Sequence, residues 1–335
     1  MILLTGGAGY IGSHMAGYLL SRNIEFIIID NLSNSDHRNI SALENKSNKK
    51  INFEKIDLRN IDALRELFLR YKFDSVIHFA GLKAVEESTR LPQHYQENNV
   101  TGSANLFSCI KEHGIERLIF SSSATVYGEP QYLPIDEAHP ISATNPYGQT
   151  KIDVENLLFH DSYFNTQCST TILRYFNPVG AFDDGLIGER PKGVPNNLMP
   201  YILGVAMKTF PHLKVFGSDY DTHDGTAIRD YIHVMDLVEA HYAALTRTPP
   251  GVKVYNVGVG KGCSVLDIIK CFERTNEVKI PYELYPRRAG DASSVFADNS
   301  RIEAELGWHP KKNLEAMCQD AYCFITKAEE KNDEA

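Results

Sequence analysis

Tyr147 and Lys151 have the residue types and the spacing of an acid–base pair. They follow Asn145-Pro146, a helix-capping residue and a proline that suits the first helical turn. Residues four apart on a helix share a face, so the Lys151 ammonium can favour ionisation of the Tyr147 phenol. A phenol with a pKa of about 10 must lose about three units to act as a base at pH 7, roughly 4 kcal/mol. Taken alone, the pair also fits a surface tyrosine beside a solvated lysine.

A hydroxyl-rich segment earlier in the chain can take part in the same chemistry. The apolar run Arg117–Ser121 continues into two more serines and ends at Ser123. A serine at the end of a strand can hydrogen-bond the same substrate oxygen as a nearby tyrosine. We therefore expect one of these serines, Tyr147 and Lys151 to act on one substrate hydroxyl.

A glycine turn at the start of the chain predicts a nucleotide site. Gly7, Gly9 and Gly12 stand between the apolar run Ile2–Leu4 and a helical pattern over His14–Leu20. Glycines allow the backbone to turn sharply and approach a pyrophosphate, and the first N–H groups of the helix face the anion. The alternative is a glycine turn with a purely structural role.

The acid that follows the second apolar run indicates which dinucleotide binds. The run Phe26–Ile29 ends in Asp30. A carboxylate at this position suits a ribose 2′-hydroxyl and repels a 2′-phosphate. The sequence therefore predicts NAD as the cofactor, in preference to NADP.

Seven short apolar runs predict the elements that position these residues. The runs are Ile2–Leu4, Phe26–Ile29, Ile51–Phe53, Ser75–Phe79, Arg117–Ser121, Thr170–Phe176 and Val254–Val257. Helical patterns separate the early ones, which predicts an α/β fold: a doubly wound parallel sheet of the Rossmann type. Ligands of such sheets lie beyond the carboxyl ends of the strands, where the candidate residues should converge.

The second half of the chain differs from the first in its composition and in its expected secondary structure. From about residue 178 it becomes rich in Pro and Gly loops mixed with short helices. We expect a Rossmann domain over 1–177, with a return segment around 235–260. A smaller mixed α/β domain over 178–335 would bind the substrate.

Composition narrows the range of partners. The net charge of −9 argues against nucleic-acid binding, which needs clustered Lys and Arg. No apolar run approaches the ~18 residues of a membrane span. The six cysteines show no Cys-x-x-Cys spacing and fit reduced thiols, so we expect a cytoplasmic protein that acts on a small molecule.

A bound metal is not expected. Asp219–Gly225 resembles the start of a calcium loop, but His223 holds a ligand position and Gly225 comes one residue late. The twelve histidines include no His-x-x-x-His pair.

Three features together resemble the extended short-chain dehydrogenase/reductase family. They are the glycine turn Thr5–Gly12, the strand end at Ser123 and Tyr147-x-x-x-Lys151. Longer segments narrow the resemblance to the UDP-glucose 4-epimerases, also called UDP-galactose 4-epimerases. These segments are Val76–Val85, Ser121–Gly128, Leu173–Ala181, Pro195–Tyr201 and Arg229–Leu237. The resemblance runs from residue 2 to about residue 310.

The resemblance implies a set of residues that hold NAD. They are Gly6, Gly7, Gly9, Tyr10, Ile11, Gly12, Asp30, Asn31, Asn34, Ser35, Asp57, Leu58, Phe79, Ala80, Gly81, Lys83, Asn98, Ser121, Tyr147, Lys151, Tyr175 and Pro178. It also implies three catalytic residues. Tyr147 would be the base, Lys151 would tune it and bind the nicotinamide ribose, and Ser123 would share the proton path at the sugar O4.

The resemblance implies the substrate side as well. Ser123, Asn177, Asn197 and Leu198 would contact the sugar and phosphates, Lys214 and Phe216 the uracil, Arg229 and Arg288 the diphosphate, and Asp291 the uridine ribose. Val295 stands where members restricted to plain hexoses carry a tyrosine. This substitution predicts that N-acetylated UDP-hexoses are accepted too.

The implied activity is 4-epimerisation of UDP-hexoses through a 4-keto sugar, with no net redox change. One alternative is a sugar-nucleotide 4,6-dehydratase, which carries an Asp-Glu pair where this chain has Ala124-Thr125. Another is a non-enzymatic NAD-binding regulator, which would not need all three catalytic residues. The resemblance also implies a homodimer through Gln93–His113 and Tyr147–His160. The alternative is that these helices pack within one chain.

Overall fold

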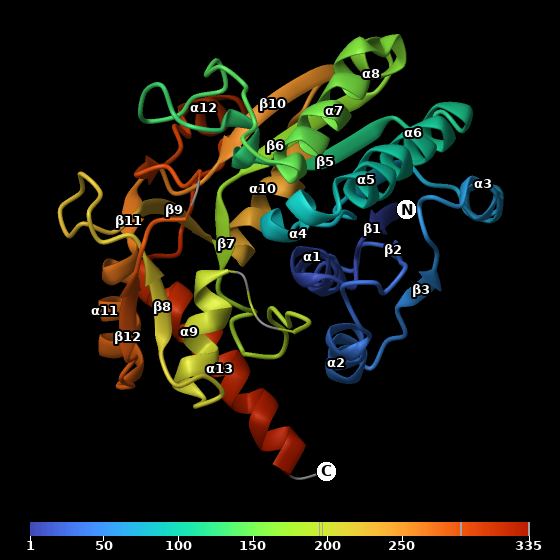
Figure 1. Ribbon diagram of the computed structural model, residues 1–335. Coiled ribbons are helices and arrows are strands. Elements are labelled where there is room, and N and C mark those ends of the chain that lie inside the picture. The colour runs from blue at the N-terminus through green and yellow to red at the C-terminus, as the bar shows by residue number, and fades with distance from the viewer. Residues whose placement is uncertain (194, 196, 289, 334–335) are drawn as a thin grey trace.

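The main sheet of the protein has seven parallel strands (Figure 1). The computed structural model describes residues 1–193, 195, 197–288 and 290–333. Its strands are β1 Ile2–Thr5, β2 Phe26–Asp30, β3 Asn52–Lys55, β4 Ser75–His78, β5 Arg117–Ser123, β6 Ser169–Tyr175 and β10 Gly251–Val257. They lie in the order β10-β6-β5-β4-β1-β2-β3, and every neighbouring pair is parallel. The predicted fold class is confirmed, and each of the seven apolar runs overlaps one strand.

The third strand begins and ends later than predicted. The run Ile51–Phe53 predicted it, but β3 begins at Asn52 and continues to Lys55. It lies at an edge of the sheet, where Asn52 and Lys55 are exposed. Because an edge strand buries less of its length, its apolar pattern marks its end poorly.

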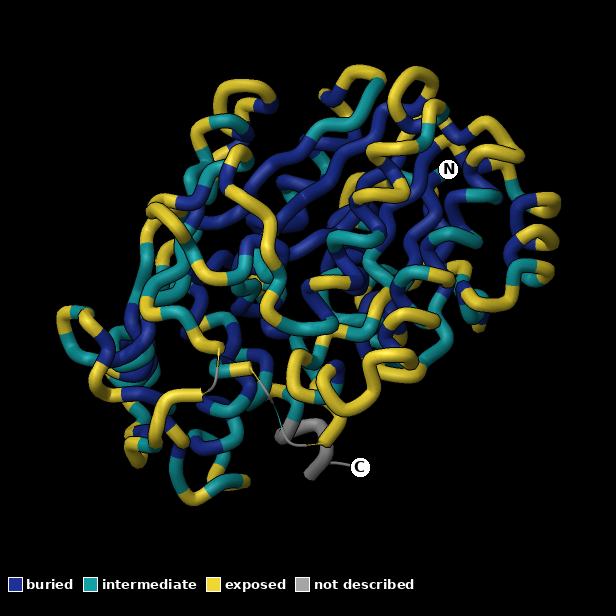
Figure 2. The backbone as a smooth tube through the Cα atoms, turned by 45° about the horizontal axis from the view of Figure 1, so that its top comes forward, coloured by how far each residue is buried: buried dark blue, intermediate teal, exposed yellow. Residues whose placement is uncertain are grey.

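Alternate residues of the central strands enter two separate cores. Ile2 and Leu4 pack with α1 (Tyr10–Ser21) and α10 (Val234–Arg247) on one face. Leu3 packs with α3 (Ile61–Arg70), α6 (Gly102–Glu112) and α7 (Pro146–His160) on the other. This alternation explains why the strands read as continuous apolar runs. In Figure 2 the buried backbone runs through the sheet, and the exposed backbone forms the outer turns.

The second half of the chain builds two small sheets. Strand β9 (Ile228–His233) pairs with β7 (Asn177–Val179), β11 (Gly262–Ser264) and β13 (Ser294–Val295), and β8 (Leu213–Phe216) pairs with β12 (Tyr282–Tyr285). Helices α9 (Leu198–Ala206), α11 (Val265–Asn276) and α13 (Leu314–Asp333) cover them around a third core. The predicted boundary between residues 177 and 178 stays a prediction, and residues 334 and 335 lie outside the described residues.

In the order of the chain, the remaining elements fall mostly between one strand of the main sheet and the next. They are α2 Arg38–Ser47, α4 Val85–Arg90, α5 Pro92–Tyr95, the π-helix η1 Gln96–Thr101, the 3₁₀ turn η2 Ala124–Tyr127, α8 Ser162–Thr166 and α12 Ser300–Leu306. No helix among the described residues is long and apolar enough to span a membrane.

The strand order reverses between β1 and β4, because β1 pairs with β2 on one side and with β4 on the other. Gly6, just after β1, has φ of +67°, and a Cβ there would lie 2.6 Å from the Ala80 nitrogen. The glycine turn therefore packs against the loop after β4. Ligands of open α/β sheets bind in the crevice at such a reversal.

Candidate active site

The glycine turn joins β1 to α1 with its backbone closely packed. A Cβ at Gly12 would lie 2.4 Å from the Gly6 carbonyl oxygen, and one at Gly7 would meet the Ile28 side chain. Helix α1 begins at Tyr10, and its N-cap, Gly9, provides no side-chain cap. The first N–H groups of α1 therefore suit an anionic ligand, as a pyrophosphate site requires.

Asp30, at the end of β2, ties this turn to the next loop. Its Oδ2 accepts from the Ala8 N–H at 3.1 Å, and its Oδ1 accepts from the Leu32 N–H and the Ser35 hydroxyl. Both carboxylate oxygens are thus fixed beside the glycine turn, where the sequence predicted the ribose contact.

Further predicted cofactor residues gather beyond β3. The Asn31 amide donates to Asp57 Oδ2 at 3.0 Å, and Arg59 binds the same carboxylate. Hydrogen bonds from Arg59 and Asn31 hold the pKa of Asp57 well below its usual range despite some desolvation. Leu58 is buried and Asn34 is exposed.

The loop after β4 carries Phe79, Ala80, Gly81 and Lys83. A Cβ at Gly81 would lie 3.4 Å from Asn99 Oδ1 and 3.7 Å from Lys151 Nζ. This brings the loop beside Lys151, the lysine of the candidate catalytic pair. Asn98, in η1, is half-buried.

Helix α7 places Tyr147 and Lys151 against β5. The Asn145 side chain caps the helix by accepting from the Gly148 N–H at 2.9 Å. Lys151 Nζ donates to the Ser121 carbonyl at 2.8 Å and lies 5.9 Å from the centre of the Tyr147 ring. Tyr147 and Lys151 are 8% and 6% exposed, so they are not a surface pair.

Ser123 ends β5 with its hydroxyl already oriented. Its Oγ accepts from the Thr125 N–H at 3.2 Å and from the Thr125 hydroxyl at 3.0 Å. Both lone pairs are therefore engaged, and the Ser123 hydroxyl proton is left to donate. A hydrogen bond with Ser123 lowers the pKa of Tyr147, so the two side chains lie close together.

Burial disfavours the two charged groups that this chemistry needs, the Tyr147 phenolate and the Lys151 ammonium. It raises the pKa of Tyr147 to about 12, and the Ser123 hydrogen bond offsets only part of the rise. Burial also lowers the pKa of Lys151 to about 8, although Glu155 raises it. Further positive charge beside the phenol is needed before it can act as a base near pH 7.

Tyr175, Asn177 and Pro178 lie where β6 gives way to β7. Burial raises the pKa of Tyr175 strongly, and a hydrogen bond with Ser121 opposes the rise. The Asn177 amide donates to the Asp230 carbonyl at 3.0 Å, which joins the end of the main sheet to β9.

The predicted substrate residues form pairs with one another. Arg229 on β9 lies 3.3 Å from Asp291, and the Arg288 guanidinium lies 4.0 Å from the centre of the Phe216 ring. Val295 on β13 is the register partner of Arg229. It packs on the apolar cluster around Val126 and Phe176, which Ala124 also joins. This places Val295 near the strand end that carries Ser123.

Two other substrate candidates have different surroundings. Lys214 is exposed, with Nζ 5.3 Å from the centre of the Tyr285 ring. Asn197 is the N-cap of α9, and Leu198 is its first residue. The quoted segment Pro195–Tyr201 includes residue 196, which lies outside the described residues.

Three residues near the site were not assigned a role from the sequence. Thr125 orients Ser123, and Asp230 is fully buried and accepts from the N–H groups of Val259, Gly260 and Ala297. Both lie within segments quoted above, but the partners of Asp230 are distant in sequence. Glu189 accepts from Lys83 Nζ at 2.7 Å and from the Asn197 amide at 3.5 Å. No local pattern marks that contact.

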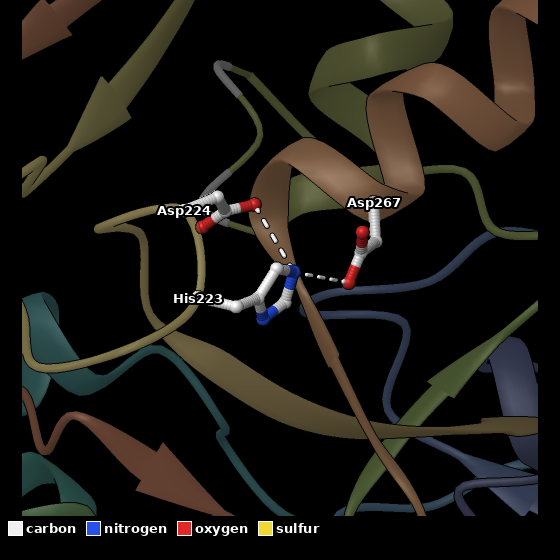
Figure 3. Close-up of side chains that lie close together, drawn as sticks. All are labelled: His223, Asp224 and Asp267. Atoms are coloured by element: carbon white, nitrogen blue, oxygen red, sulfur yellow. Dashed lines mark ion pairs between the residues drawn. The ribbon is translucent and has the colours of Figure 1, made fainter.

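His223, Asp224 and Asp267 bring potential ligand atoms within 4.8 Å of one another (Figure 3). The two carboxylates already have structural partners. Asp267 completes the capping box of α11 with Ser264, and Asp224 accepts from Ser264 and Thr226. Exposed His223 lies 3.2 Å from Asp267. Helix capping and ion pairing account for the cluster, and the expectation of no metal stays a prediction.

Comparison with known proteins gives one family model and many relatives. The model described as GDP-mannose 4,6 dehydratase matches residues 3–321. The UDP-glucose 4-epimerase of Pasteurella multocida is 48% identical over 329 residues, which covers 97% of each chain.

Solved structures agree closely with this fold. The UDP-glucose 4-epimerase of Stenotrophomonas maltophila, bound to NAD and formylated UDP-arabinopyranose, has a TM-score of 0.95 and 42% identity. The comparison covers 98% of this chain and 99% of that one. The enzyme of Bifidobacterium longum, in complex with NAD+ and UDP, has a TM-score of 0.93 and 42% identity, with coverage of 97% and 98%.

Proposed function

Because this chain belongs to the UDP-glucose 4-epimerases, within the wider family of the GDP-mannose 4,6 dehydratase model, we infer that it interconverts UDP-hexoses by inversion at C4. It is an NAD-dependent isomerase. The observation that carries this conclusion is the meeting of Ser123, Tyr147 and Lys151 at the carboxyl edge of the sheet, beside the glycine turn.

The family model carries the name of a dehydratase, but the residues after Ser123 favour epimerisation. Elimination across C5 and C6 needs acid and base groups beside the serine. This chain has Ala124 and Thr125 there, and Thr125 is used to orient Ser123. The close relatives by sequence are epimerases, which agrees with this difference.

The residues around the glycine turn fit NAD. Side chains at Gly6, Gly7 or Gly12 would clash with neighbouring protein atoms, so glycine keeps the turn tight enough for its backbone to approach a pyrophosphate, and Asp30 is fixed at the end of β2 for a ribose. When bound, NAD supplies reversible hydride acceptance at the sugar C4, so that the sugar passes through a 4-keto state. Lys151, Tyr175 and Pro178 are proposed to border its nicotinamide end.

Within this site Tyr147 is proposed to accept the O4 proton and later to return it. The Ser123 hydroxyl donates to the same oxygen, because Thr125 occupies its lone pairs. The Lys151 ammonium stabilises the phenolate and, with the positive nicotinamide ring, offsets the effect of burial on Tyr147. The proton therefore moves between the sugar O4 and Tyr147, while Ser123 on β5 and Lys151 on α7 stabilise the two oxygens.

The substrate side is proposed to hold the nucleotide firmly and the hexose loosely. Arg229 and Arg288 would bind the diphosphate, Lys214 and Phe216 the uracil, and Asp291 the ribose. Asn177, Asn197 and Leu198 would contact the sugar and phosphates. The 4-keto sugar must turn over to receive hydride on its other face, so strong bonds to the hexose would slow the reaction.

We also propose that N-acetylated UDP-hexoses are substrates. Val295 is half-buried and lies on the strand beside Arg229. A tyrosine at this position would fill space that an acetamido group at the sugar C2 needs. The proposal therefore rests on the smaller volume of valine.

The division of the chain and its assembly are also proposals. We propose an NAD-binding domain over 1–177 with the return segment that contains β10, and a substrate domain over 178–335. A homodimer through the helices of 93–113 and 147–160 is supported by exposed Leu157 and Phe159 on α7. All six cysteines are free thiols, which supports a cytoplasmic location.

Incubation with UDP-galactose, followed by analysis of the nucleotide sugars, tests the function. Formation of UDP-glucose up to an equilibrium mixture supports epimerisation. A 4-keto-6-deoxy sugar nucleotide would support the dehydratase instead. No conversion at all, with free exchange of NAD, would support a regulator.

A further inference from the structure

Helix α7 carries a third buried ionisable residue, Glu155, one turn beyond Lys151. Tyr147, Lys151 and Glu155 follow at intervals of four, so they share the helix face that packs on the sheet. Glu155 is only 1% exposed. Glu155 has no role in the proposed proton transfer to and from the substrate.

The Glu155 carboxylate is bound by two adjacent strands. Its Oε1 accepts from the Ser122 hydroxyl at 2.5 Å and from Arg174 Nε at 3.0 Å, and its Oε2 accepts from Arg174 Nη2 at 2.6 Å. Ser122 and Arg174 are register partners in β5 and β6. The carboxylate therefore attaches α7 to both strands at one level of the sheet.

Both strand partners stand next to residues of the candidate site. Ser122 lies between Ser121, whose carbonyl accepts from Lys151, and Ser123. Arg174 directly precedes Tyr175 and also donates to the Tyr127 hydroxyl at 3.1 Å. A shift of this ion pair would move the groups that surround the proposed proton path.

A buried ion pair is a weak source of stability, because the loss of water around two charges offsets much of their attraction. The Glu155–Arg174 pair nevertheless has side chains only 1% and 3% exposed and a two-pronged geometry. Such a pair is better suited to fixing a unique arrangement than to strengthening the fold.

We propose that Glu155 is a positioning residue for this reaction: it holds the catalytic face of α7 on β5 and β6 and keeps Lys151 protonated. The inference rests on the proposed function. It adds to that function a charged residue that touches neither substrate nor cofactor.

The charges around Lys151 support this role. Tyr147 lies on its own helix, His78 faces it from β4, and Tyr175 lies at the end of β6. Burial and Lys151 lower the pKa of His78 to about 3, and burial raises the pKa of both tyrosines, so these three groups are neutral near pH 7. Among the described residues, Glu155 is the acid that raises the pKa of Lys151.

The test compares the pH dependence of kcat for UDP-galactose in wild type and in Glu155→Gln/Arg174→Met. The double variant removes both charges, so no unpaired charge stays buried. We expect it to fold and to retain NAD. Its alkaline limb should move to lower pH by about one unit, which is roughly a tenfold loss of turnover above that limb.

Two further variants sharpen the test. Glu155→Gln/Arg174→Gln also removes both charges but keeps amide groups for hydrogen bonds, so its alkaline limb should also move to lower pH, and it decides the question if the first double variant does not fold. Tyr127→Phe removes another contact of Arg174 and leaves both charges, so its limb should not move even if its melting temperature falls.

The outcomes separate the inference from the proposed function. If the wild type is active and a folded double variant has the same alkaline limb as the wild type, the role of Glu155 alone is overturned. A wild type without epimerase turnover at any pH overturns the proposed function.

Discussion

The catalytic edge of the sheet and the proposed substrate side are built differently. Ser123, Tyr147 and Lys151 are 8%, 8% and 6% exposed, and they lie on a long strand and a long helix. Lys214, Arg288 and Asp291 are exposed and lie on short strands or in loops. The first region is shaped before a ligand arrives, whereas the second presents charges that a ligand must bring together.

This difference separates the residues proposed to catalyse the reaction from those proposed to bind the nucleotide. Buried groups whose hydrogen bonds are set in advance change the barrier to reaction directly. Exposed ion pairs such as Arg229–Asp291 are worth little to stability, so their partners can be exchanged for a ligand at low cost. Changes at the catalytic edge should therefore lower kcat, and changes on the substrate side should raise KM or alter specificity.

The largest effect is expected from Tyr147→Phe. It removes the proposed proton acceptor and leaves the glycine turn intact, so turnover should fall about 10³-fold or more with NAD retained. Initial rates with UDP-galactose, together with the bound nucleotide released on denaturation, measure both. Tyr163→Phe is the control, because its hydroxyl donates to Ile115 far from the site. Near-native turnover in Tyr147→Phe would refute the base assignment.

Gly12→Ala should break the cofactor site without touching a proposed catalytic group. The new methyl group would lie 2.4 Å from the Gly6 carbonyl and 2.7 Å from the Gly7 Cα, so the turn must open. We expect loss of bound NAD and a fall in activity of about 10²-fold in protein without added NAD. Gly114→Asn, at an open position with φ of +65°, should keep its NAD. Full NAD content in Gly12→Ala would contradict the placement of the pyrophosphate.

Arg229→Gln tests the proposed binding of the diphosphate by Arg229. Loss of one charge-assisted contact should raise KM for UDP-galactose about 10- to 100-fold with a smaller change in kcat. Arg287→Gln is a matched control, because Arg287 pairs with Asp219 on the surface. Equal effects of the two substitutions would remove Arg229 from the substrate site.

Val295→Tyr should have the smallest and most selective effect. A steric clash in a packed site costs about 1–3 kcal/mol, enough to lower turnover of UDP-N-acetylgalactosamine tenfold or more relative to UDP-galactose. Val295→Ala, which keeps the space open, should retain both activities. No wild-type activity on the acetylated sugar, or an equal loss on both sugars, would refute the proposal.

The sequence predicted the main sheet and the helix that carries Tyr147 and Lys151 well, because their signals are local. Buried parallel strands read as apolar runs, and the helix that carries Tyr147 and Lys151 begins with Asn145-Pro146. The strands of the two small sheets were not predicted, because they are short and pair with distant segments. Residues such as Glu155 and Asp230 were missed for the same reason. Their roles depend on partners in other elements. The position of an acid in the sequence does not show which strand residues will bind it.

The most direct test of the mechanism follows a deuterium label at the sugar C4. Purified protein freed of unbound nucleotide is given UDP-galactose labelled with deuterium at C4, and no NAD is added. Because hydride leaves and returns within one cycle, we predict UDP-glucose that keeps the deuterium at C4, with no release of NADH. Loss of the label, or turnover only with added NAD while NADH accumulates, would show a net dehydrogenase and contradict the epimerase assignment.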